Sequence, residues 1–362
     1  MFWDGTIDKA YNYKEFFEAQ KKLYDASSFM PWSYPPQFDL ITAGLSTLPI
    51  GLAYLVFSGM TMALYFFVIR LISPGYLGSV LLVVFPAVII NIRSGQNGFL
   101  TGAIAGLFFL TFMRRSSLAG IPLGLMIIKP HLAVGMTVLT LVSKRWSIVG
   151  GAALTVIIST ILATIILGSS IWLAFAEGIK ATSYFLELGA YPMFRMSSVY
   201  ATLHKFGIPP TTALAIQLFV AAIACSAIVI AFINIKALKS LIGVTAIASL
   251  FVSPYNYDYD LTLLGLAAAA LLPDIATRAR PFEIFPLLLL SWISCGWGLL
   301  ISGLAEKREV EYEIIYIDPS YALSSIALVL LTVWTLHIIK RSPRTQETES
   351  NVQIPAQRLR SS

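Results

Sequence analysis

Long apolar segments alternate with short polar segments along most of this chain of 362 residues. A helix needs about 20 predominantly apolar residues to cross a bilayer. The pattern therefore predicts an all-α, polytopic integral membrane protein with about eleven spans, some of them short or broken. We expect the spans at 50–70, 76–90 and 98–113, as two short helices within 117–143, and at 146–168, 209–235, 238–253, 259–273, 281–303 and 319–339.

The segment 117–143 decides the expected orientation. As one helix, its 27 residues would measure roughly 40 Å, which exceeds the ~30 Å apolar core of a bilayer. Pro130 favours a break at Lys129-Pro130, because proline lacks the N–H that continues a helix. Two short helices place the pairs Arg114-Arg115 and Lys144-Arg145 on one side, and basic residues in short loops prefer the cytoplasm. We expect the N-terminus outside and the C-terminus inside.

The N-terminal segment, residues 1–36, is polar and rich in aromatic residues. Such segments dock at the membrane–water interface, so we expect an interfacial helix at 13–24 on the outer face. Tyr34-Pro35-Pro36 is expected to start a short dipping helix within 37–48. A polar N-terminus without a signal peptide is difficult to deliver outside. We therefore expect a first helix upstream of Met1, which this chain lacks.

Residues 37–339 form the expected multi-pass domain. Its outer loops are 169–207, which is amphipathic, and 304–318. The polar tail, 340–362, is expected to be disordered in the cytoplasm.

Composition agrees with a membrane protein. The chain is 57% hydrophobic and 12% charged, whereas soluble domains carry roughly 25% charged residues. Both cysteines lie in apolar segments, and the three histidines are far apart, so neither type suggests a metal site. The net charge of +6 does not by itself indicate nucleic acid. We expect no nucleic-acid partner, no metal and no cofactor.

Two polar interruptions lie inside the apolar sequence. One runs from Asn91 to Gly98, and the other is Lys129-Pro130-His131. Irregular backbone at membrane depth is tolerated only where it lines a cavity or is buried in protein. The interruptions therefore indicate a site on the outer side. The alternative for the first interruption is an ordinary outer loop.

Short motifs occur in a fairly specific order along the chain: Tyr34-Pro35-Pro36, Gly95-Gln96-Asn97, Ala119-Gly120, Lys129-Pro130, and Ser253-Pro254-Tyr255 with Tyr259-Asp260-Leu261. In this order, over most of residues 5–273, the chain resembles glycosyltransferase family 87, also known as domain of unknown function 2029. The resemblance implies a GT-C-like bundle in the cytoplasmic membrane. It also implies inverting transfer of a hexose, often mannose, from a polyprenyl-phosphate donor to a lipid or glycan acceptor on the outer face.

The resemblance also implies an outer-loop carboxylate as the general base. In the family this Asp follows the first helix, usually as Asp-Phe, and this sequence contains no match. Asp4 or Asp8 can stand in for it. Asp258 and Asp260 are further candidates, but two positions apart they diverge on a helix, so at most one is expected to face the site.

Departure of a lipid phosphate requires cations or hydrogen-bond donors. Lys129 is the first candidate, because a charge in an apolar segment needs a cavity or a partner. The alternative is a Lys129 paired with a carboxylate or carbonyl. Weaker candidates for phosphate and sugar are Arg93, Gln96, Asn97, Arg195, Tyr255 and Tyr259, although the tyrosines also suit an interfacial belt and Arg93 a solvated loop. His131 is more typical of a core or helix-start position.

Two other functions fit the same pattern. Broken helices and charges at membrane depth are also features of secondary transporters. No internal repeat is evident, and the polar residues gather on one side. The third possibility is a catalytically inactive family member that binds or assembles.

Overall fold

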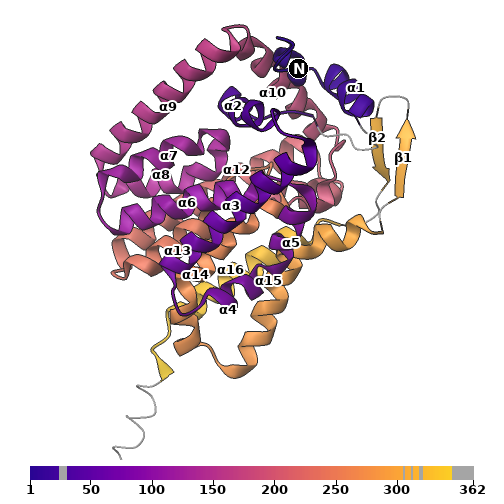
Figure 1. Cartoon of the computed structure of the whole chain (residues 1–362). Helices are drawn as coiled ribbons and strands as arrows, with labels where there is room; N and C mark the ends of the chain where they lie inside the picture. The colour runs from indigo at the N-terminus through magenta and orange to yellow at the C-terminus, as the bar shows by residue number, and fades with distance from the viewer. Residues whose placement is uncertain (24–30, 305, 311–312, 318–320, 345–362) are drawn as a thin grey trace, which may run out of the picture.

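The computed structural model describes residues 1–23, 31–304, 306–310, 313–317 and 321–344, and these form a helical bundle (Figure 1). The α-helices are α1 Tyr13–Leu23, α2 Pro36–Leu45, α3 Ile50–Ile72, α4 Leu77–Val83, α5 Phe85–Ser94, α6 Gly98–Met113, α7 Gly120–Leu125, α8 Pro130–Val142, α9 Trp146–Leu167, α10 Ile171–Glu187, α11 Val199–Lys205, α12 Pro210–Asn234, α13 Leu238–Ser249, α14 Thr262–Arg278, α15 Pro281–Ser302 and α16 Ser324–Ile339. Short 3-10 helices lie at Ile7–Tyr11, Ser117–Ala119, Met126–Ile128, Met193–Arg195 and Asp258–Leu261.

Several of these helices are long and apolar enough to cross a membrane. Five qualify among the described residues: α3, α9, α12, α15, and α14 with the preceding 3-10 turn. The pair α4–α5 qualifies as a sixth, bent span, and five further apolar helices are shorter, with 10–17 residues. The fold is therefore that of a polytopic membrane protein. The count of eleven spans and the outer position of the interfacial helices stay predictions.

The span expected at 76–90 is not one straight helix, because α4 and α5 meet at a 72° bend. Pro86, in the first turn of α5, has no N–H to donate to the carbonyl one turn earlier. Helix α15 donates to two carbonyls at the bend: Trp292 Nε1 to Leu82 O, and Ser291 Oγ to Val83 O, both at 2.7 Å. The bend is therefore stabilised by its neighbour, as broken helices in membranes require.

The break in 117–143 is confirmed. One helical segment ends at Ile128, and α8 begins at Pro130. The chain before and after this broken segment meets at its far side. There, Arg145 Nη1 donates to Phe112 O at 2.6 Å, and the guanidinium lies 3.8 Å from the Phe112 ring centroid. Arg114-Arg115 and Lys144-Arg145 therefore lie at one end of the bundle, as the two-helix interpretation predicts.

Helix α6 lies at the centre of the core. Twelve of its 16 residues are buried, which is typical of a helix that is apolar on all sides. Small residues allow close packing: Gly102 faces Tyr65 of α3 and Thr262 of α14, and Gly106 faces Val68 of α3. This packing fixes the start of α6 against the start of α14, where the site lies.

The ends of the chain agree in part with expectation. Helix α1 lies within the segment 13–24 that the sequence predicts to be helical, and α2 begins at Pro36 as expected. The segment 304–318, expected as an outer loop, contains an antiparallel strand pair, β1 Glu306–Val310 and β2 Glu313–Ile317, which the sequence pattern did not indicate. The predicted disorder of the tail concerns residues that lie mostly outside the described part of the chain.

Candidate functional site

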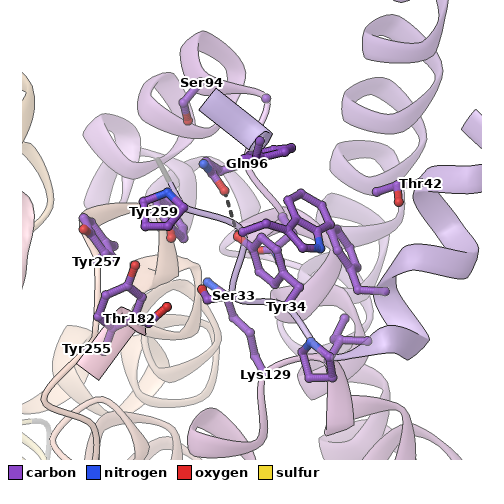
Figure 2. A pocket seen from close by; sticks show the side chains of 18 of the residues that line it. Ser33, Tyr34, Thr42, Ser94, Gln96, Lys129, Thr182, Tyr255, Tyr257 and Tyr259 are labelled. Carbon is purple, nitrogen blue, oxygen red and sulfur yellow. Dashed lines mark hydrogen bonds between the residues drawn. The ribbon is translucent and has the colours of Figure 1, made fainter. Parts of the chain in front are cut away.

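A cavity of about 730 Å³ lies where several helices begin or end (Figure 2). Its walls come from the loop before α2, the α5–α6 junction, the break before α8, helix α10 and the segment before α14. Apolar side chains dominate the lining. Its polar side chains include Ser33, Tyr34, Thr42, Ser94, Gln96, Asn97, Lys129, His131, Thr182, Tyr255, Tyr257 and Tyr259. Both polar interruptions of the sequence therefore line one cavity.

Lys129 forms a buried ion pair at the edge of this cavity. Its Nζ donates to Asp260 Oδ1 at 2.6 Å, and the two side chains are 6% and 1% exposed. The same ammonium lies 4.3 Å from the Tyr259 ring centroid and 5.9 Å from that of Tyr34. The alternative in which Lys129 pairs with a carboxylate is thus correct. The lysine nevertheless lines the cavity, so the pair holds a cation at its wall.

Gln96 and Asn97 add neutral polar groups to the lining of the same cavity. Asn97 is 2% exposed, and neither its Oδ1 nor its Nδ2 has a hydrogen-bond partner among the described residues. Gln96 Oε1 accepts a hydrogen bond from the Tyr34 hydroxyl at 3.1 Å, drawn as a dashed line in Figure 2. Buried amides without partners are rare. The Asn97 amide therefore has the character of a binding group for hydroxyl or phosphate oxygens.

The backbone of the first interruption differs from the sequence prediction. Asn91 to Ser94 continue α5 as a helix, and only Gly95 has a positive φ, of 61°. The Gly95 N–H donates to Asn91 O at 3.0 Å and ends the helix, as glycine does in a left-handed cap. Gln96 and Asn97 therefore form a short, fixed connection to α6.

Two carboxylates before α14 point in different directions, as their spacing predicts. Asp260 pairs with Lys129, whereas Asp258 accepts two hydrogen bonds from Arg195, each 3.0 Å long. Asp258 is fully buried, and its Oδ1 also accepts the Tyr259 N–H. A bidentate arginine pair fixes both partners. Each aspartate thus pairs with one of the three candidate cations, Asp260 with Lys129 and Asp258 with Arg195.

The turn that carries these aspartates is attached to the start of α6. Asn91 Nδ2 donates to Tyr259 O at 3.0 Å, and Thr262 Oγ1 donates to Gly98 O at 2.8 Å. A Cβ at Gly98 would collide with the Tyr259 carbonyl and the Asn91 amide. The absence of a side chain at Gly98 therefore lets the two polar segments approach each other.

Arg93 does not line the large cavity. It is exposed at the end of α5 and lines a second pocket, of about 200 Å³, together with Arg195 and Asp258. Ser94 and Pro192 line both pockets, so the two are neighbours. Of the predicted cations, Lys129 therefore lines the large cavity, and Arg93 and Arg195 line the small pocket.

Asp4 and Asp8 are both exposed on the N-terminal segment. Asp4 pairs with the amino group of Met1 at 3.3 Å, and neither residue lines the large cavity. In the described part of the chain that lining contains no Asp or Glu. Among all the described residues, no group of three or more His, Cys, Asp or Glu is arranged to hold a metal ion.

Two residues near the cavity had little or no role in the sequence predictions. His131 lines the cavity, and its buried Nε2 has no hydrogen-bond partner among the described residues. Asp39, in α2, is fully buried and accepts hydrogen bonds from Tyr11 and Trp32. Its signal in the sequence is a carboxylate inside the apolar segment 37–48.

A comparison with protein-family models shows to which family the chain belongs. The model of glycosyltransferase family 87 matches residues 32–254, which is more than half of the chain. The chain belongs to glycosyltransferase family 87. The match includes Tyr34, Gln96, Asn97, Lys129 and Arg195, and it ends just before the tyrosine and aspartate turn at 255–260. Searches of curated proteins and of solved structures gave no match. The family indicates a glycosyltransferase, and the long apolar helices indicate a membrane protein.

Proposed function

We propose that this chain transfers a hexose, mannose in the first instance, from a polyprenyl-phosphate donor to a lipid or glycan acceptor, with inversion at the anomeric carbon. The observation that carries the proposal is the Lys129 ammonium, which lines a largely apolar cavity together with the buried Asn97 amide. Apolar walls suit a prenyl chain, and a fixed cation with amide groups suits its phosphate and sugar.

The chemistry requires a group that stabilises the departing phosphate. One N–H of Lys129 donates to Asp260, which leaves two N–H groups of the ammonium for an anion in the cavity. Preorganised donors of this kind stabilise charge that develops in the transition state. Asp260 holds the cation in place, and Tyr255 and Tyr259 offer ring faces and hydroxyls to the sugar. Arg93 and Arg195 offer a neighbouring anion site.

The proposal places the cavity on the outer face of the cytoplasmic membrane. Helices α6 and α8 both begin at the cavity and end at the basic pairs 114–115 and 144–145. At 1.5 Å per residue they separate the two ends by about 20–24 Å. Because basic residues in short loops favour the cytoplasmic side, the cavity faces outward.

An acceptor hydroxyl also needs a base, and four aspartates are the proposed candidates. Asp258 and Asp260 are buried in ion pairs with Arg195 and Lys129, so Asp258→Asn and Asp260→Asn should lower the yield of folded protein together with transfer. Asp4 and Asp8 are exposed, so Asp4→Asn or Asp8→Asn should leave the yield unchanged. Loss of transfer at normal yield would identify the base.

The test is a transfer assay with purified protein and polyprenyl-phosphate-[14C]mannose, with membrane lipid extract as the acceptor source. Radioactivity in a new lipid or glycan product supports the proposal. Uptake of solute into sealed vesicles without product would favour a transporter. Donor binding without transfer, in protein that is folded and stable, would favour an inactive binding member of the family.

A further inference from the structure

The carboxylate of Asp39 joins three segments beneath the wall of the large cavity. Asp39 is fully buried in α2. Its Oδ1 accepts a hydrogen bond from Trp32 Nε1 at 2.8 Å, and its Oδ2 lies 2.7 Å from the Tyr11 hydroxyl. That hydroxyl is also 2.9 Å from the backbone carbonyl of Tyr34. One side chain thus links the N-terminal 3-10 helix, the loop 31–35 and α2.

Two residues of this network form part of the cavity lining: Trp32, which donates to Asp39 directly, and Tyr34, whose carbonyl accepts from the Tyr11 hydroxyl. Their rings make an edge contact with centroids 5.0 Å apart. The Tyr34 hydroxyl donates to Gln96, and the Tyr34 ring lies near the Lys129 ammonium (Figure 2). Asp39 itself does not line the cavity. Its influence therefore passes through Trp32 and Tyr34.

A buried carboxylate is costly unless donors satisfy it. An apolar residue would fill the same space more cheaply, but it would leave the Trp32 N–H without an acceptor. The Asp39 carboxylate binds the Trp32 indole and the Tyr11 hydroxyl from opposite oxygens, which fixes the orientation of both rings. Buried polar contacts of this type specify one arrangement of neighbouring groups.

We infer that Asp39 is a positioning residue that orients Trp32 and Tyr34 as the wall of the cavity and thereby sets its affinity for the glycosyl-lipid donor. The part that concerns the donor rests on the proposed function. The part that concerns the wall does not, because it follows from the contacts of Asp39.

Three variants test the inference. Asp39→Ala removes both acceptors. Tyr11→Phe removes one donor but keeps the ring that packs on Phe175 with centroids 5.6 Å apart. Asp39→Asn keeps the network, because its Oδ1 can accept from Trp32 while its amide donates to the Tyr11 oxygen and the Tyr11 hydroxyl donates to the Tyr34 carbonyl.

The matched control is Gln37→Ala, two positions earlier in the same helix. Gln37 is 7% exposed, donates to Thr160 of α9 at 3.0 Å and does not line the cavity. Tyr11→Phe should raise KM for polyprenyl-phosphate-mannose about fivefold, the size of one lost hydrogen bond, with a smaller change in kcat. Asp39→Ala, which removes both acceptors, should raise KM by at least as much. Asp39→Asn should restore the wild-type KM, and Gln37→Ala should change stability without changing KM.

A second readout needs no substrate. Thr182→Cys, on the α10 side of the cavity, is introduced after Cys225 and Cys295 are replaced by alanine. A loosened wall should increase the labelling rate of Thr182→Cys by a thiol reagent in the Asp39→Ala background and not in the Gln37→Ala background. Equal rates in folded protein would overturn the inference. Faster labelling without any transfer by the wild type would instead count against the proposed function alone.

Discussion

Lys129 Nζ lies 2.6 Å from Asp260 Oδ1, although 131 residues separate the two in the sequence. The contact joins the break before α8 to the turn before α14, and it places a cation at the cavity wall. Burying either charge alone would be strongly unfavourable. The pair therefore links the stability of the bundle to the electrostatics of the site.

This link predicts two effects of Lys129→Ala. Removing one partner of a buried pair typically costs about 3–5 kcal/mol, because the other charge stays buried without compensation. The variant should therefore lose both thermal stability and transfer. In Lys129→Ala/Asp260→Ala, most of the stability should return, measured by thermal unfolding in detergent, while transfer stays at background. A double variant with wild-type turnover would show that Lys129 only neutralises Asp260.

A topological prediction concerns Gln96 and Thr42, which line the large cavity from different segments. In a background without Cys225 and Cys295, Gln96→Cys and Thr42→Cys should react with a membrane-impermeant thiol reagent added to intact cells. Arg114→Cys, at the far end of α6, should react only after permeabilisation, because the basic end is expected in the cytoplasm. The opposite labelling pattern would invert the proposed orientation.

The close approach at Gly98 predicts a large effect of a small substitution. In Gly98→Ala, the new Cβ would collide with the Tyr259 carbonyl, so the turn at 258–261 must shift. We expect a loss of about 1–3 kcal/mol in the free energy of unfolding, together with weaker donor binding. Gly59→Ala in α3 is the control, since nothing lies within 4 Å of its Cβ. Equal stability of the two variants would contradict the proposed attachment of α6 to that turn.

The buried carboxyl group of Asp39 should make the free energy of unfolding depend on pH. Burial raises the pKa of Asp39 to about 6, although the hydrogen bonds from Tyr11 and Trp32 oppose the shift. The ordinary value is about 4, so between these values the folded chain binds more protons than the unfolded chain. Lowering the pH from 7 to 5 should therefore stabilise the wild type relative to Asp39→Asn, which does not titrate. The comparison is made by thermal unfolding of both proteins at each pH, and a difference that is the same at pH 7 and pH 5 would contradict the raised pKa.

The sequence by itself determined where most helices begin and end. Apolar segments and prolines act locally: Pro36 starts α2, and Pro130 starts α8 after a break at Lys129, whatever the rest of the chain does. The spacing of Asp258 and Asp260 likewise indicated that they diverge. Ordered motifs also indicated the family that the comparison then matched.

Only the tertiary structure decided which groups meet. The partner of Lys129 comes from a distant segment, and the acceptor for Trp32 is a carboxylate that apolar patterning hides. The bend at Val84 depends on donors from α15, more than 200 residues away. Helix boundaries follow from local backbone chemistry, whereas a buried polar group must be satisfied wherever packing brings a partner, and no local pattern records that choice.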